Sequence, residues 1–249
     1  LSKLFKISSK MGTLIAVGTS ICGASAIVAT SPVINANKEE VTYAVANITI
    51  FGVIAMLLYP FLGGYIFDND EIAVGLFIGS SIHETAQVAG AGLIYAEQFK
   101  SPKTMEVAAV TKLVRNISMI LVIPIISYMY INNKDRSSED KSPSILSMVP
   151  MFIIGFIIMS IIRTTGDYGV QNNQYAFGNI NNDDWNRLII FIRSISEYAL
   201  GIAMAAIGLT TNLVSLKSLG IKPFYVGFAA SLCVGLVSFI GIKIIKIFL

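Results

Sequence analysis

Long apolar stretches, each close to twenty residues, alternate with short polar connections along this sequence. A helix needs about 20 mainly apolar residues to cross roughly 30 Å of hydrocarbon, and all its backbone groups are then bonded internally. Of the 249 residues, 54% are hydrophobic and 13% are charged, whereas soluble domains carry roughly 25% charged residues. A water-soluble fold would need polar outer faces that these stretches lack. We therefore predict an all-α, polytopic membrane helical bundle.

Seven stretches qualify as membrane segments, and we predict that they form a single transmembrane domain over residues 1–249. Lysines near the start favour a cytoplasmic N-terminal side. The connection between the second and third segments is acidic, however, so the orientation stays open. The predicted segments are 11–34, 41–62, 72–95, 105–131, 145–162, 188–213 and 223–245.

The segments 11–34 and 72–95 contain glycine and hydroxyl residues where an ordinary membrane helix is uniformly apolar. The pattern Gly-(Thr/Ser)-Ser-Ile begins at Gly18 and again at Gly79, 61 residues later. Small residues let helices pack closely, but they also suit a helix interrupted near the midplane, whose freed N–H groups and hydroxyls bind a substrate. Because the pattern occurs twice, we favour interrupted helices. The candidate substrate-binding hydroxyls are Thr19, Ser20, Ser25, Ser80 and Ser81.

Ionisable residues inside apolar segments are costly and often mark a pathway or a site. At helical spacing, Ser80, His83, Glu84 and Gln87 form one polar stripe. We predict that His83 and Gln87 bind substrate, and that Glu84 or His83 carries a coupling proton. The alternative is a structural role, in which His83 and Glu84 satisfy each other or nearby backbone groups. No metal site is predicted, because His83 is the only histidine.

Lys112 and Arg115 lie three residues apart in segment 105–131, on one face of a helix. A guanidinium is always charged and suits bidentate anion binding, so we include both residues among the substrate-binding candidates. Snorkelling of the two side chains to the membrane interface is an equally good interpretation.

Four motifs follow one another along the chain. They are Gly18–Ala26, Gly79–Gly92, Lys112-Leu-Val-Arg115 and Ala203–Thr211. This set resembles the bacterial UPF0324 family, also called the YeiH-like or sulfate exporter family, and the resemblance extends from about residue 11 to about residue 227. The resemblance implies a multi-pass protein of the bacterial plasma or inner membrane. It also implies kinship with the bile-acid-transporter-like superfamily, whose inverted repeats contain broken, crossing helices.

The chain resembles the C-terminal two-thirds or so of such a protein, so we expect an N-terminally truncated sequence. The favoured function is secondary transport or export of a small anion, either sulfate-like or organic. The expected partners are the lipid bilayer and that anion. A homodimer is left open. We expect no cofactor and no catalytic residue. We also expect no nucleic-acid partner, because the net charge is only +3 and the basic residues are scattered.

Two other functions stay open. A membrane-embedded enzyme would use His83 and Glu84 as an acid–base pair, and it would need a nucleophile within hydrogen-bond reach of His83. A non-transporting scaffold or sensor has no need for polar interruptions, so continuous helices over 11–34 and 72–95 would favour it.

Overall fold

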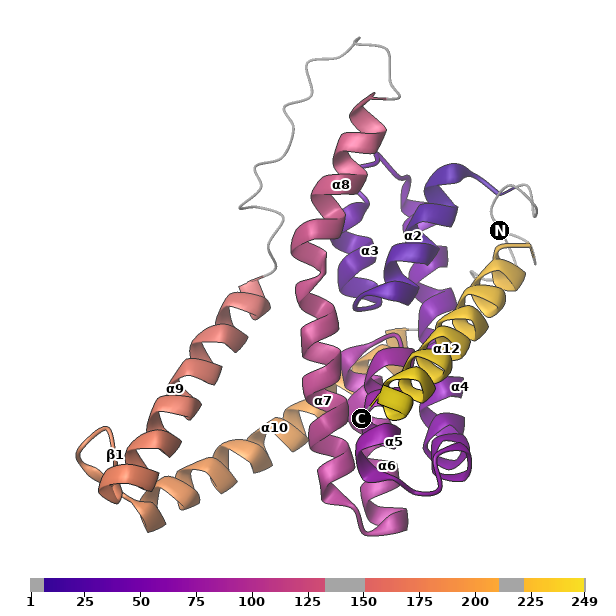
Figure 1. The fold of residues 1–249 in the computed structure, drawn as a ribbon. Helices are drawn as coiled ribbons and strands as arrows, with labels where there is room; N and C mark the ends of the chain where they lie inside the picture. Colours follow the sequence, from indigo (N-terminus) through magenta and orange to yellow (C-terminus); the bar gives the residue numbers. More distant parts are fainter. Residues whose placement is uncertain (1–6, 133–150, 211–221, 249) are drawn as a thin grey trace. The chain divides into compact units, whose positions relative to one another are not determined.

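The computed structural model of the chain describes residues 7–132, 151–210 and 222–248 (Figure 1). Most of these residues are helical, which confirms the predicted all-α class, apart from a two-stranded antiparallel ribbon of β1 (Tyr175–Ala176) and β2 (Ile180–Asn181). The helices pack into two compact units. Unit 1 comprises the described parts of residues 1–148 and 207–249, and unit 2 comprises those of residues 149–206.

The first two helices of unit 1 fold back on each other as a hairpin (hairpin 1). Helix α2 (Ser9–Ser20) ends in a three-residue turn, and α3 (Ala24–Thr30) packs back against it. Gly23 in this turn has a φ of +72°, which L side chains rarely adopt and glycine adopts freely. At the open end, Lys10 Nζ donates a hydrogen bond of 2.5 Å to the carbonyl oxygen of Asn35.

A second hairpin has the same construction (hairpin 2). Helix α5 (Glu71–Ser81) ends at the turn Ile82–Glu84, and α6 (Thr85–Phe99) returns beside it. The open end is joined by the Tyr95 hydroxyl, which donates to Asn69 Oδ1 at 3.3 Å. The predicted interruptions in segments 11–34 and 72–95 are therefore present. Each segment is a pair of half-length helices rather than one continuous helix, and each half is shorter than the about 20 residues that a spanning helix needs.

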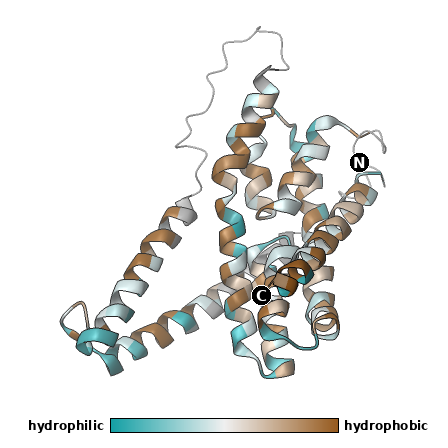
Figure 2. Cartoon of the chain, viewed as in Figure 1, coloured by the Kyte–Doolittle hydropathy of each residue, from teal (hydrophilic) through white to brown (hydrophobic). Residues whose placement is uncertain are grey.

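A long helix follows each hairpin. Helix α4 (Lys38–Ile66) follows hairpin 1, and α7 (Pro102–Ile117) runs on into α8 (Met119–Asn132) after hairpin 2. Helix α12 (Lys222–Phe248) completes unit 1. Among the described residues, three helices are long and apolar enough to cross a membrane by length and composition: Lys38–Ile66, Pro102–Tyr130 and Lys222–Phe248. Figure 2 shows the hydrophobic residues along α8 and α12.

The two hairpins lie along the α7–α8 helix from opposite ends (Figure 1). The open end of hairpin 1 is near the end of α8, where the hydroxyls of Thr13 and Tyr130 are 2.9 Å apart. The open end of hairpin 2 is near the start of α7, where Thr104 Oγ1 donates to the carbonyl oxygen of Glu71 at 3.0 Å. The order of hairpin and long helix thus occurs twice, and the second copy runs in the opposite direction.

Buried apolar side chains join the hairpins to the long helices. Hairpin 1 packs against α4 through Leu14, Ile15 and Ile48. Hairpin 2 approaches α7 so closely that a Cβ on Gly79 would lie 2.4 Å from the carbonyl oxygen of Ala108. Helix α12 packs against α2, α4 and α5. The turns of both hairpins are therefore enclosed by helices that come from distant parts of the chain.

Unit 2 consists of α9 (Met151–Asn173), the β1–β2 ribbon and most of α10 (Asn182–Thr210). Trp185 packs over Gly166, and its Nε1 donates to Asp167 Oδ1 at 2.7 Å. These helices overlap the predicted segments 145–162 and 188–213. Residues 145–150 and 211–213 of those segments lie outside the described residues.

Candidate functional site at the hairpin turns

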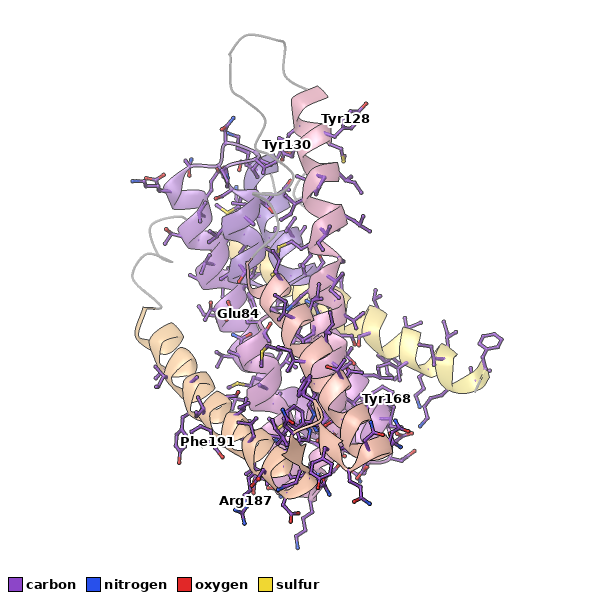
Figure 3. The ribbon with its side chains drawn as sticks, turned by 90° about the vertical axis from the view of Figure 1, so that its left-hand side faces the viewer. Glu84, Tyr128, Tyr130, Tyr168, Arg187 and Phe191 are labelled. Carbon is purple, nitrogen blue, oxygen red and sulfur yellow. The ribbon has the colours of Figure 1, made fainter. Side chains whose placement is uncertain are left out.

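The turns of the two hairpins contact each other. The backbone N–H of Ala24 donates to Glu84 Oε1 at 3.3 Å. Gly23 packs against the same side chain, since a Cβ at this position would lie 2.3 Å from Glu84 Cγ. Glu84 is only 5% exposed, and its Oε2 atom is buried with no hydrogen-bond partner among the described residues. Figure 3 labels Glu84 at mid-height of unit 1, well away from Tyr130 near the end of α8.

Lys112 on α7 joins both turns. Its Nζ atom donates to the carbonyl oxygens of Ile21 and Ile82, each at 2.9 Å, and to that of His83. The side chain is fully buried. An ammonium group has three donors and no acceptor, so these three carbonyl groups use its whole hydrogen-bonding capacity.

Arg115, one helical turn further along α7, makes the same kind of connection. Its Nε donates to the carbonyl oxygen of Ile21 at 3.0 Å, and its terminal nitrogens donate to those of Thr19, at 2.7 Å, and Ser80. Both cations therefore bind the carbonyl ends of α2 and α5, where backbone oxygens lack helical partners and the helix dipole is negative. Among the carbonyls that they bind are the pairs 19 and 80, and 21 and 82, which keep the 61-residue spacing seen in the sequence.

The predicted hydroxyls lie in or beside these turns, but each of four donates back to its own helix. Thr19 and Ser20 donate to the carbonyl oxygens of Ile15 and Ala16, both at 2.6 Å. In hairpin 2, Ser80 donates to Leu76 at 2.5 Å and Ser81 donates to Phe77. Ser20 and Ser25 are exposed, whereas Thr19 and Ser81 are buried. In this conformation the hydroxyl protons of these four residues are used within the helices.

Gln87 fixes the turn of hairpin 2 to α4. Its Oε1 atom accepts a hydrogen bond of 3.3 Å from the backbone N–H of Glu84, and its Nε2 donates to the carbonyl oxygen of Thr49 at 3.2 Å. A Cβ on Gly52 would lie 1.9 Å from Gln87 Oε1, so only glycine allows this approach. The side chain is fully buried, and its polar atoms hold the backbone that positions Glu84.

His83 contacts α12 rather than the neighbouring carboxylate. Its Nε2 atom lies 3.1 Å from Ser231 Oγ, and both residues are buried. About two helical turns further along α12, the Ser238 hydroxyl contacts that of Ser80. The sequence reasoning missed these two serines. Their seven-residue spacing, which places both on one face of an otherwise apolar helix, was the available signal.

Ser231 is a nucleophile type within hydrogen-bond reach of His83, which is the geometry that the enzyme alternative requires. The third member of such an arrangement is missing, because His83 Nδ1 has no hydrogen-bond partner among the described residues. Within residues 7–132, 151–210 and 222–248, no group of three or more His, Cys, Asp or Glu side chains is arranged to hold a metal ion.

The comparisons place the chain among bacterial membrane proteins. The family model described as conserved hypothetical protein 698 matches residues 1–227. The chain is 37% identical to a UPF0324 membrane protein of Fusobacterium nucleatum, over 100% of this chain and 70% of the relative. It is 32% identical to a UPF0324 membrane protein of Clostridium tetani, over 96% of this chain and 66% of the relative. It is also 32% identical to the UPF0324 inner membrane protein YeiH of Escherichia coli, over 89% of this chain and 57% of the relative.

This chain spans roughly two-thirds of the length of the first two relatives and less of the third. No solved structure matches it, so the bile-acid-transporter-like superfamily stays a prediction. The resemblance drawn from the four motifs is confirmed by the family model and by the relatives. The chain belongs to the UPF0324 family of membrane proteins.

Proposed function

We propose that this chain forms the core of a secondary transporter for a small anion in the bacterial cell membrane. The observation that carries the proposal is the meeting of two oppositely directed hairpin turns beside the α7–α8 helix. In a bilayer, irregular backbone is tolerated only where protein buries it or where it lines a water-filled cavity. Interrupted helices that meet at one depth are typical of the binding sites of secondary transporters.

The charges at the turns support an anionic substrate. Lys112 and Arg115 supply two cations against the single carboxylate of Glu84, so the net charge there is positive when all three are ionised. Helix α6 also begins at this point, and helix N-termini attract anions. In the proposal, Lys112 and Arg115 balance the charge of a sulfate-like or organic anion. Thr19, Ser20, Ser25, Ser80, Ser81 and Gln87 supply polar contacts after local rearrangement.

Glu84 and His83 are the proposed carriers of a coupling proton. Glu84 Oε2 is a buried acceptor with no hydrogen-bond partner among the described residues, and a bound proton would give this oxygen a donor to share. His83 contacts Ser231 on a separate helix, so a change in its protonation would reach α12. Proton binding at either residue would change the charge beside the turns, which links the proton to the anion.

The test is anion flux into proteoliposomes that contain the full-length protein. Sulfate and a panel of small organic anions are offered with and without an imposed pH gradient. Arg115→Ala and His83→Ala are compared with wild type, and Arg163→Ala serves as the control because Arg163 forms an exposed ion pair with Asp167 in unit 2. We expect the first two variants to lose flux and the control to retain it. Unchanged flux of every tested anion in both site variants would reject the site.

A membrane-embedded hydrolase is a second candidate, favoured by the 3.1 Å contact between His83 Nε2 and Ser231 Oγ. Such an enzyme would form a covalent intermediate on Ser231, with His83 as the base. A fluorophosphonate probe distinguishes the two functions. Labelling that Ser231→Ala abolishes would favour the hydrolase, and absence of labelling would count against it.

A further inference from the structure

Three backbone carbonyl oxygens surround the Nζ atom of Lys112. The oxygens of Ile21, Ile82 and His83 come from the turns of two different hairpins and converge on one point. No backbone N–H of the described residues bonds to these three carbonyl oxygens, because each lies where a helix has just ended. Converging backbone oxygens at interrupted helices are the ligands that transporters offer to coupling cations.

We infer that this point is a binding site for a monovalent cation of ammonium size, and that Lys112 occupies it in place of a free ion. The Nζ–oxygen distances of 2.9 Å to Ile21 and Ile82 suit an ammonium ion or K⁺. They exceed the about 2.0–2.6 Å at which Mg²⁺ and Ca²⁺ hold oxygen ligands. The ligands are also neutral carbonyl groups, which suit a weakly hydrated monovalent ion better than a divalent one.

The surroundings set the expected affinity of a free cation at this point. Arg115 shares the carbonyl oxygen of Ile21, so its positive charge opposes a second cation nearby. Glu84 follows His83 directly and places a buried carboxylate beside the ligands, which favours a cation. Because these charges act in opposite directions, we expect binding in the millimolar range rather than tight binding. Cation binding at this point depends on the folded protein alone, whether or not the chain transports an anion.

Removal of the Lys112 side chain should open the site to free ions. In Lys112→Ala, the carbonyl groups of Ile82 and His83 lose this donor and are left buried, and that of Ile21 keeps only its bond from Arg115 Nε, which destabilises the fold. Ammonium, methylammonium or K⁺ should then enter and restore part of the stability. N-methyl-D-glucamine is too large for the space, and it serves as the reference cation at equal ionic strength.

The measurement is the thermal unfolding temperature of the purified full-length protein in detergent. For a dissociation constant of about 10 mM, about 100 mM ammonium chloride should raise the Tm of Lys112→Ala by roughly 3–5 °C over N-methyl-D-glucamine chloride. Wild type should show no such difference. Lys103→Ala is the matched control, because it removes an exposed lysine from the first turn of the same helix, and it too should show no difference.

Two results would overturn the inference. One is an equal Tm for Lys112→Ala in ammonium and in N-methyl-D-glucamine. The other is an ammonium effect of the same size in wild type or in Lys103→Ala. If the alanine variant does not survive purification, Lys112→Ser is purified in parallel in the two salts. Because a bound ligand stabilises the folded state, we expect at least about twofold more monodisperse protein in ammonium chloride than in N-methyl-D-glucamine chloride. Equal recoveries in the two salts would contradict the inferred cation site.

Discussion

The contact between Gly23 and Glu84 gives the most direct test of the arrangement at the hairpin turns. In Gly23→Ala, the new Cβ would lie 2.3 Å from Glu84 Cγ, so either the buried Glu84 side chain would have to leave its place or the two turns would have to separate. The substitution also places an L side chain at a φ of +72°. Backbone strain of this kind costs about 1–3 kcal/mol, and overpacking in a closed core costs about 1–3 kcal/mol more. We expect a loss of about 2–6 kcal/mol in the free energy of unfolding.

Two other glycines separate these contributions. Gly178 has a φ of +79°, and no atom of the described residues lies within 4 Å of the point that a Cβ would occupy, so Gly178→Ala should show the strain without the clash. Gly241 in α12 has neither a positive φ nor such a neighbour within 4 Å, so Gly241→Ala should be neutral or stabilising by about 0.5–1 kcal/mol. Thermal unfolding in detergent, followed by the change in Tm, compares the three variants.

A double-mutant cycle tests the clash itself. Glu84→Ala removes the Cγ atom that the new methyl group would meet, so Gly23→Ala should cost about 1–3 kcal/mol less in that background. If Gly23→Ala costs no more than Gly178→Ala in the wild-type background, or if the cycle shows no coupling, the close contact between the turns does not exist. The proposed site would then lose its structural basis.

Three further predictions concern single interactions. Gln87→Leu should destabilise the fold by about 1–3 kcal/mol in a denaturation experiment, because it leaves the buried backbone N–H of Glu84 without its acceptor and removes the bond that ties this turn to α4. The hydrogen bond from Lys246 and those from the α5 backbone lower the pKa of Asp70, so this carboxylate stabilises the fold above its unfolded pKa and the effect fades as the pH falls through the lowered value. Asp70→Asn should therefore cost less than about 1 kcal/mol at neutral pH, since the pair is partly exposed, and nothing in strong acid. Trp185→Phe should cost about 0.5–1.5 kcal/mol, through loss of the bond to Asp167, and circular dichroism melts of the two proteins would measure it.

The interruptions of the first and third apolar segments could be predicted from the sequence, because glycine and hydroxyl residues gather at Gly18 and Gly79. The reversal of the chain at each interruption could not. A broken helix that continues across the membrane and one that turns back contain the same residue types at the break. The distinguishing information is the packing of α3 against α2 and of α6 against α5, which depends on contacts far apart in the sequence.

The candidate site was predictable as a set of residues and less so as a set of contacts. The spacing of Lys112 and Arg115 correctly placed both on one face of α7. It could not show that this face meets the carbonyl ends of α2 and α5. Every residue has a backbone carbonyl group, so the residue types do not show which carbonyl groups the two cations bind. The partner of His83 was missed for a similar reason, since Ser231 is an isolated serine 148 residues away.

For the proposed transporter, the joint anchoring of both hairpins by Lys112 and Arg115 bears on the leakage of ions. Each cation donates to carbonyl groups of hairpin 1 and hairpin 2 at once. If one hairpin moved away, the cation would therefore keep its bonds to the other hairpin. Withdrawal of both hairpins together would strip two cations of all these partners in a region with little water, which is a state of high energy. The same six hydrogen bonds that close the turns would therefore disfavour a continuous open pore, whichever side opens first.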